Sequence, residues 1–361
     1  YLPYTVDEFT NWLGAAKTIH LNGGYAAARE TLHYPGYTPG WRLALLLPWQ
    51  IDGALVLGRS AAAGFVLHAG LAGLLFDIVR RELVGRFPLT PAWVSIAAWI
   101  VVLVFLAAQG TGTLWTYTLL IEQPQIYFYT GVGFLLFAIR PDSDATSNTL
   151  FYIGLALLGG YLIKSATLAL LPGVVFALLW FSWHRGNRAR GKGLSDFLRN
   201  AALVLGPTLV GASLWRGTLG DIGQDCFASP LATLTSAALS DALARDWVDL
   251  AARFAVATGS YVLEYKTPVL IVACIGLFCA CAWKRAAAVI ALGSFAAIYL
   301  VSLYWYHLSC FGDFYFAQLN SIERFTRVVL QPLHALGLLA FAVAAFSLAR
   351  GRIFNDPLPS L

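Results

Sequence analysis

Charged residues are scarce in this chain, and methionine is absent. Of its 361 residues only 12% are charged and 58% are apolar, whereas an ordinary soluble domain has about 25% charged residues. This composition excludes a soluble enzyme and favours a protein with many membrane-spanning helices. The net charge of +5 does not predict nucleic-acid binding, because lysine and arginine cluster between apolar stretches, as they do in the cytoplasmic loops of membrane proteins.

The missing methionine affects how the sequence is interpreted. At about 2% usage, roughly seven methionines would be expected in a chain of this length. The chain has none and begins with Tyr1. We therefore expect the natural chain to start before Tyr1. We base the interpretation on local motifs, because methionine positions missing from the sequence would alter longer spacings.

Several sites that would define a soluble enzyme are also missing. The six histidines show no metal-ligand spacing, and no phosphate-binding loop, dinucleotide-binding motif or serine-nucleophile motif occurs. Cys226 and Cys310 fall in predicted outer loops, where a disulfide between them and free thiols are both open alternatives. The other three cysteines share one apolar stretch and are expected to be small buried side chains: Cys274, Cys279 and Cys281.

Long apolar stretches predict nine membrane-spanning helices, since about 20 apolar residues cross a bilayer. A shorter stretch at 43–57 contains Pro48, Gln50 and Asp52, and we expect it to enter the membrane without crossing it. The predicted spans are 60–78, 91–108, 125–139, 148–163, 165–183, 196–215, 267–283, 286–304 and 326–349.

Lysine and arginine clusters set the expected orientation, because positively charged loops stay in the cytoplasm. If every cluster is inside, an even number of spans separates each cluster from the next. The clusters occur at 80–86, 185–192, 284–285 and 350–352. The polar segments 1–42, 110–123, 216–266 and 305–325 then lie outside, with Lys164 in a tight outer turn.

The predicted fold is an all-α, polytopic transmembrane bundle with amphipathic helices in its outer loops. Within 216–266, helical spacing predicts one apolar stripe facing the membrane surface, formed by Leu239, Leu243, Trp247, Leu250 and Phe254. The organisation follows as a first outer loop at 1–42 carrying the catalytic acids, transmembrane helices at 43–215, a large outer loop at 216–266, C-terminal transmembrane helices at 267–349 and a tail at 350–361.

Three groups are candidates for chemistry, and each has a simpler structural interpretation. Asp7 and Glu8 open an amphipathic segment, where they either cap a helix or supply a general base. Lys164 separates two apolar stretches, where it either extends to the membrane surface or binds a phosphate. Arg324 opens the last long helix, where it either pairs with a nearby acid or binds a phosphate.

Further polar residues are expected on the same outer face. Ionisable groups at a membrane edge usually line a cavity, because their exposure to lipid is costly. Arg327 lies one turn after Glu323 and is expected to pair with it. The other residues expected near this face are Tyr34, Tyr37, Glu122, Gln123, Gln125, Tyr304, Tyr306, His307 and Asp313.

The order of four local motifs resembles that of the polytopic glycosyltransferases of the GT-C fold, a superfamily that includes protein mannosyltransferases and aminoarabinose transferases. The likeness spans residues 1–345. The motifs are Val6-Asp7-Glu8-Phe9, then Tyr34-Pro35 to Pro39-Gly40-Trp41, then Gly159-Gly160-Tyr161-Leu162-Ile163-Lys164 followed by Pro172, and finally Ser321-Ile322-Glu323-Arg324-Phe325 with Pro332.

The resemblance implies transfer of a sugar from a polyprenyl-phosphate lipid to an acceptor hydroxyl on a saccharide, lipid or protein. Asp7 would be the general base of an inverting reaction, helped by Glu8. Lys164 and Arg324 would bind the donor phosphate, and Glu122 together with Glu8 would position the acceptor or a divalent metal. The remaining substrate-binding residues would be Tyr34, Tyr37, Gln123, His307 and Glu323.

This interpretation places a multi-pass protein in the plasma (inner) membrane, in contact with membrane lipids and with its active site on the periplasmic or extracellular side. No cofactor is predicted with certainty, and the sequence leaves open whether a divalent metal is bound. One alternative is a transporter or flippase, although no internal repeat supports it. A second is a scaffold without catalysis, which predicts that Asp7, Lys164 and Arg324 do not converge.

Overall fold

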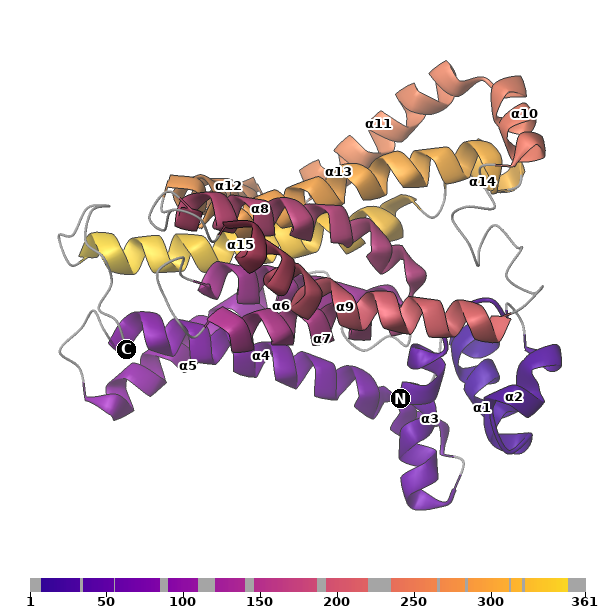
Figure 1. The fold of residues 1–361 in the computed structure, drawn as a ribbon, viewed down its shortest axis with the longest axis horizontal. Coiled ribbons are helices and arrows are strands. Elements are labelled where there is room, and N and C mark those ends of the chain that lie inside the picture. Colours follow the sequence, from indigo (N-terminus) through magenta and orange to yellow (C-terminus); the bar gives the residue numbers. More distant parts are fainter. Residues whose placement is uncertain are drawn as a thin grey trace.

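The computed structural model of the chain shows a bundle of helices (Figure 1). It describes residues 8–32, 35–54, 56–84, 90–109, 121–139, 146–186, 193–219, 235–264, 267–282, 285–311, 313–319 and 322–349. All regular structure in these residues is helical, and they contain no strand. The all-α prediction is therefore confirmed for this part of the chain, while the likeness to the GT-C fold stays a prediction.

The described helices follow one another along the chain in two halves. The first half contains the π-helical turn η1 (Glu8–Leu13), α1 (Gly14–Leu21), α2 (Tyr25–Ala28), η2 (Arg29–Thr31), α3 (Gly40–Asp52), η3 (Leu57–Ser60), α4 (Ala61–Val84), α5 (Pro91–Gln109), α6 (Glu122–Ala138) and α7 (Thr146–Ile163). The second half contains the 3₁₀ turn η5 (Ser165–Leu170), α8 (Leu171–Gly186), α9 (Gly193–Leu219), α10 (Ser236–Ala244), α11 (Trp247–Glu264), α12 (Thr267–Ala282), α13 (Ala286–Ser309), α14 (Asp313–Gln318) and α15 (Ile322–Ala349).

Among the described residues, five helical segments are long and apolar enough to cross a membrane. They are Arg59–Val84, Ser165–Trp183, Leu194–Thr218, Ala286–Ser309 and Ile322–Leu348. Three shorter apolar helices, Pro91–Leu106, Ser147–Ile163 and Leu270–Ala282, coincide with further predicted spans. These are the helices expected of a membrane protein, because an apolar helix satisfies its own backbone hydrogen bonds in lipid.

Helix α6 is the central helix of the bundle and packs against α4, α7, α13 and α15. Of its 17 residues, 13 are buried. A helix surrounded in this way needs apolar side chains on every face, and the sequence supplies them from Ile126 onward. Buried polar side chains are concentrated in its first turn, at Glu122, Gln123 and Gln125, with Thr130 further along. Polar groups buried together at a helix start require a specific reason.

Two ends of the bundle are defined by contacts between distant segments. At one end, Arg285 before α13 donates a hydrogen bond from Nη2 to Oε1 of Glu82 at the end of α4, at 2.7 Å. The Arg285 guanidinium also lies 4.4 Å from the ring of Phe137, at the end of α6. The basic clusters near Arg81 and Arg285 therefore share one end, as the predicted alternation of helix directions requires.

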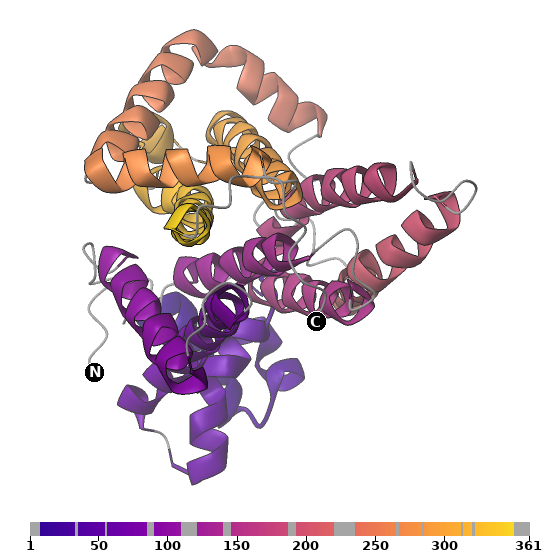
Figure 2. The same ribbon diagram turned by 90° about the vertical axis from the view of Figure 1, so that its left-hand side faces the viewer.

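The opposite end carries helices α1–α3, together with α10 and α14 (right side of Figure 1). Figure 2 shows the same helices from the end of the bundle, with the indigo α1–α3 region and the orange α10–α13 region on opposite sides. The α1–α3 region has its own small hydrophobic core, which includes Trp12, Ile19, Trp41 and Trp49. This end therefore consists of short helices packed on the bundle rather than of long spanning helices.

Small residues let the long helices touch closely. A side chain at Gly276 of α12 would overlap the backbone of Gly337 in α15, so neither position tolerates a Cβ without movement. Such contacts are typical of membrane helices. Ala273, Gly276 and Ala280 form the buried face of α12. The cysteines predicted to be buried lie on the other faces, and this prediction is wrong for Cys274 and Cys281, which are exposed.

The described part of the large loop, residues 235–264, forms two helices. The chain is extended at Arg245 (φ −86°, ψ 155°), between α10 and α11, and this break separates the predicted apolar stripe into two parts. Leu250 and Phe254 are buried against the bundle, whereas Leu239, Leu243 and Trp247 are exposed. The prediction of one continuous stripe is therefore wrong, although amphipathic helices are present.

Candidate functional site

Three charged residues from distant parts of the chain converge at the end of the bundle that carries α1–α3. Oε1 of Glu122, at the start of α6, lies 3.8 Å from Nζ of Lys164 and 3.4 Å from Nε of Arg324. Only 5% of the Glu122 side chain is exposed, against 15% for Lys164 and 26% for Arg324. We call these three residues the Glu122 cluster. Its formation agrees with the predicted sharing of one face by Lys164 and Arg324.

Aromatic side chains cover the two cations of this cluster. The ring centroid of Phe325 lies 5.0 Å from Nζ of Lys164 and 5.3 Å from Cζ of Arg324. Phe311 stacks on Phe325 with 6.4 Å between ring centroids and 16° between ring planes. A cation over an aromatic face is stabilised by the ring quadrupole. The aromatic residue after Arg324 therefore belongs to the cluster.

Lys164 is positioned by a break between two helices. Helix α7 ends at Ile163, and Lys164 adopts an extended conformation (φ −156°, ψ 135°) before η5 begins. Its carbonyl accepts a hydrogen bond from the amide of Thr167 at 3.1 Å. The hydroxyl of Thr167 bonds that of Tyr129 at 2.9 Å, which ties this turn to α6. The turn and the Glu122 helix are thereby held together.

A buried polar chain runs from the cluster into the bundle along α6. Nε2 of Gln125 donates to the hydroxyl of Tyr129 at 2.9 Å, and Tyr129 continues the chain to Thr167. All three side chains are buried. The sequence interpretation placed Gln125 on the outer face without a role, and it missed Tyr129 and Thr167. Gln125 and Tyr129 are one helical turn apart, and this spacing is the sequence pattern that could have linked these two residues.

The first polar segment packs against residues that adjoin this cluster in the chain. Ile121 and Ile163, which precede Glu122 and Lys164, belong to the same hydrophobic core as Trp12 and Leu13. At Gly40, an added Cβ would lie 2.5 Å from the carbonyl oxygen of Leu162. Two of the motifs that suggested a family resemblance are thus in contact, since one contains Gly40 and the other contains Leu162.

Arg42 fixes the shape of the first segment and was not singled out from the sequence. Its guanidinium lies 5.9 Å from the ring centroids of both Trp12 and Tyr37, and Nε donates to the carbonyl of Asn11 at 3.3 Å. Burial lowers the pKa of Arg42, and the neighbouring Tyr25 and Tyr37 partly offset this effect. Tyr37, predicted to bind substrate, therefore packs on a buried cation.

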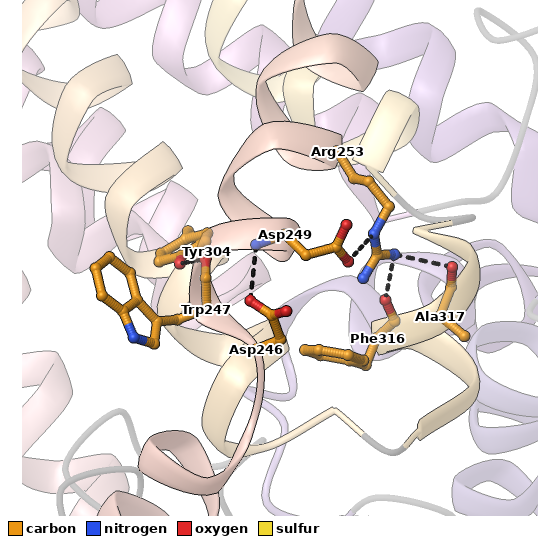
Figure 3. A network of polar contacts seen from close by, with 7 residues as sticks. All are labelled: Asp246, Trp247, Asp249, Arg253, Tyr304, Phe316 and Ala317. Atoms are coloured by element: carbon orange, nitrogen blue, oxygen red, sulfur yellow. Dashed lines mark hydrogen bonds and ion pairs between the residues drawn. The ribbon is translucent and has the colours of Figure 1, made fainter.

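Helix α14, which precedes α15 in the chain, is held by α11 (Figure 3). Nη1 of Arg253 donates to the carbonyls of Phe316 and Ala317 at 2.9 and 3.0 Å, and Nε donates to Asp249 at 2.7 Å. The chain then passes through Leu319, whose φ of 49° is unusual for leucine. The polar residues of α11 therefore anchor the segment that leads to Arg324.

Arg245 reinforces the same anchor from the start of α11. Nη1 of Arg245 donates to the carbonyls of His307 and Phe311 at 3.0 and 3.1 Å, and Nη2 donates to Asp313 at 3.1 Å. Arg245 and Arg253 also lie 4.9 and 5.4 Å from the ring centroid of Phe316. These contacts place the large loop over the connection between α13 and α15.

The structure also describes three further predicted site residues, Glu323, His307 and Gln123. Glu323 is half-exposed and pairs with Arg327 at 2.5 Å, as the helical spacing predicted. His307 is buried, with Nδ1 2.8 Å from the carbonyl of Leu303 and its ring 4.7 Å from that of Phe311. Gln123 is buried in the first turn of α6 beside Glu122.

Some predictions fall on residues whose positions are not described. Asp7 and Tyr34 lie outside the described residues, as does the side chain of Glu8, so their predicted roles stay predictions. Cys310 is disulfide-bonded, and Cys226, its partner in one of the two alternatives, lies outside the described residues.

The divalent metal left open by the sequence would need several side chains that lie close together as its ligands. No three histidine, cysteine or acidic side chains in the part of the chain that the structure describes gather as ligands for a metal ion. The alternative that paired Glu122 with Glu8 depends on a side chain outside that part, so it stays a prediction.

The Glu122 cluster can act as a site for an anion. Its described side chains carry two positive charges and one negative charge, and an ammonium and a guanidinium are the groups that bind phosphate in proteins.

Comparison of the chain with known protein families, with curated proteins and with solved structures finds no match.

Proposed function

We propose that this protein transfers a sugar from a polyprenyl-phosphate lipid to an acceptor hydroxyl, at the outer face of the plasma membrane. The observation that carries the proposal is the convergence of Lys164 and Arg324 on Glu122 at one end of an apolar bundle. A lipid phosphate would bind the two cations, while its hydrocarbon tail would lie along the apolar helices.

The length of the ion pairs in the Glu122 cluster supports phosphate binding. Contacts of 3.4 and 3.8 Å are longer than the roughly 2.7–2.9 Å of a charge-assisted hydrogen bond. The carboxylate therefore neutralises the two cations without a close hydrogen bond to either. A phosphate with several acceptor oxygens could bond both cations at shorter distances, and it would gain energy where the carboxylate does not.

The proposed reaction is an inverting displacement. Asp7 takes the proton of the acceptor hydroxyl, and the resulting oxygen attacks the anomeric carbon of the sugar. The bond between that carbon and the phosphate oxygen breaks, and its electron pair passes to the lipid phosphate. Lys164 and Arg324 stabilise the negative charge that develops there. The packing of Trp12 and Leu13 against Ile121 and Ile163 favours this arrangement, because it brings the first segment to the cations.

Binding and transfer measurements test the proposal separately. The purified protein, in a zwitterionic detergent, is titrated with short-chain polyprenyl phosphate. We expect Lys164→Gln and Arg324→Gln each to weaken binding about tenfold to a hundredfold, the usual effect of losing a charged hydrogen bond. Arg199→Gln is the matched control, since Arg199 is an exposed arginine that pairs with Asp196 at the start of α9.

The transfer arm uses a polyprenyl-phosphate hexose and an acceptor mixture from membranes. Asp7→Asn is expected to keep lipid binding and to abolish sugar transfer, because amide nitrogen cannot take the proton. Wild-type affinity for the lipid in both cation variants would refute the phosphate site, and full transfer by Asp7→Asn would refute the base.

A further inference from the structure

Two buried acceptor atoms next to the Glu122 cluster have no hydrogen-bond partner among the residues that the structure describes. They are Oε2 of Glu122 and Oε1 of Gln125. The two residues are three positions apart on α6, so their side chains are neighbours on one face of the helix. An unpaired buried acceptor is costly, and it is uncommon in folded proteins. A pair of them beside two cations therefore calls for a ligand that donates hydrogen bonds.

The amide of Gln125 is held with its oxygen available. Its Nε2 donates to the hydroxyl of Tyr129, which in turn bonds Thr167 on the turn after Lys164. Because the donor end of the amide is engaged by a buried network, the acceptor end is the part left for a ligand. The carboxylate of Glu122 is divided in the same way, with Oε1 facing the two cations and Oε2 without a partner.

We infer that Oε2 of Glu122 and Oε1 of Gln125 form a saccharide subsite that accepts hydrogen bonds from hydroxyl groups of a neutral sugar. This inference rests on the proposed function, and it names the part of that site which recognises the sugar. Sugar hydroxyls are donors without charge. A cationic ligand would be repelled by Lys164 and Arg324, which lie 3.8 and 3.4 Å from Oε1 of Glu122. The phosphate and the sugar of one donor lipid would thus bind adjacent parts of one site.

The test compares two lipids that carry the same charge. One is a short-chain polyprenyl phosphodiester bearing a neutral hexose, and the other is the same lipid with a methyl group in place of the hexose. A neutral alkyl glycoside without phosphate is the third probe, and the detergent contains no sugar. The wild-type protein is expected to bind the hexose lipid about tenfold more tightly than the methyl lipid, the effect of one hydrogen bond of ordinary strength.

Gln125→Met removes the acceptor at similar volume, together with the donor to Tyr129. It is expected to bring the ratio of the two affinities close to one, because the hexose lipid loses more binding than the methyl lipid. Thr130→Val is the matched control, because it removes another buried polar group from α6 and is expected to keep the preference. A series of deoxy-hexose lipids tested on the wild-type protein gives an independent result, since a site built for hydroxyl groups rejects analogues that lack them.

The outcomes separate this inference from the proposed function. An unchanged preference in Gln125→Met, or equal binding of all deoxy analogues, overturns the subsite and leaves the phosphate site standing. If neither phosphodiester binds but the alkyl glycoside binds in a Gln125-dependent way, the subsite stands and the lipid-donor proposal fails. Binding of none of the three probes overturns both.

Discussion

Replacing Glu122 by glutamine gives a direct test of the charge balance at the site. In the ligand-free protein its carboxylate lies 3.4 Å from Nε of Arg324 and 3.8 Å from Nζ of Lys164. With an effective dielectric constant of about 20, each pair contributes roughly 4–5 kcal/mol of Coulomb energy before desolvation is subtracted. Partial exposure of the two cations reduces the net effect. We expect Glu122→Gln to destabilise the ligand-free protein by about 1–3 kcal/mol, less than the loss of a fully buried pair.

The same substitution should strengthen phosphate binding. A phosphate oxygen at about 2.8 Å from the two cationic nitrogens, on the side away from Glu122, would lie about 6 Å from the carboxylate. Repulsion between two unit charges at that distance is about 3 kcal/mol for the same dielectric constant, and solvent near the cations lowers it. Removing the carboxylate charge is therefore expected to increase the affinity for polyprenyl phosphate by about tenfold.

Thermal unfolding in detergent, with and without polyprenyl phosphate, measures both effects. Without lipid, Glu122→Gln should unfold at a lower temperature than the wild type. With increasing lipid its stabilisation should exceed that of the wild type, because ligand stabilisation grows with concentration relative to Kd. Asp196→Asn is the matched control, since it removes one carboxylate charge beside Arg199, away from the cluster.

One result would refute this reasoning. If Glu122→Gln bound polyprenyl phosphate as weakly as the wild type or more weakly, the carboxylate would not compete with the lipid for Lys164 and Arg324. The Glu122 cluster would then be a structural ion-pair group, and the phosphate would have to bind elsewhere.

Two further predictions concern the parts that hold the site. Gly40→Ala should cost about 1–3 kcal/mol of stability through overlap with Leu162, and it should also weaken lipid binding by moving Lys164. The control Gly131→Ala, which has no atom within 4 Å of the added Cβ, should do neither. Unaltered lipid binding in a destabilised Gly40→Ala protein would show that α3 does not position Lys164. At the other end of the bundle, Glu82→Gln should lower the free energy of unfolding in detergent by about 3 kcal/mol, because Arg285 stays buried without its counter-charge. Adding Arg285→Gln should recover part of that loss. A Glu82→Gln protein as stable as the wild type would contradict this prediction.

Much of the fold could be predicted, because helix formation in this chain follows from long apolar stretches. The nine predicted spans all fall on helices, and five have the length and hydropathy of membrane-crossing helices. Which faces are buried could not be predicted as well. Leu239 and Leu250 share one helical stripe in the sequence, yet the break at Arg245 leaves one exposed and the other buried. A stripe predicts amphipathicity, but a single backbone change decides what each part contacts.

Less of the site could be predicted, because its members come from separate helices. Lys164 and Arg324 were candidates because each is a lone cation beside an apolar stretch, and the structure brings both to Glu122. Nothing local marks Glu122 as their common partner, since it precedes Lys164 by 42 positions and Arg324 by 202. His307, a predicted substrate-binding residue, is buried with its ring 4.7 Å from that of Phe311, and its role stays a prediction.

The two acidic residues that pair with buried cations differ in a way that bears on function. Glu82 and Arg285 are both less than a tenth exposed and are joined at 2.7 Å between Oε1 and Nη2, while Nη1 of Arg285 has no hydrogen-bond partner among the described residues. Glu122 faces two cations at longer distances, and its Oε2 likewise has no partner there. The two arrangements therefore differ in the ion pair itself, because one is a direct hydrogen bond and the other consists of two longer contacts. A ligand that donates hydrogen bonds to Oε2 and accepts them from the cations would fit the longer arrangement, and the proposed sugar phosphate has both properties.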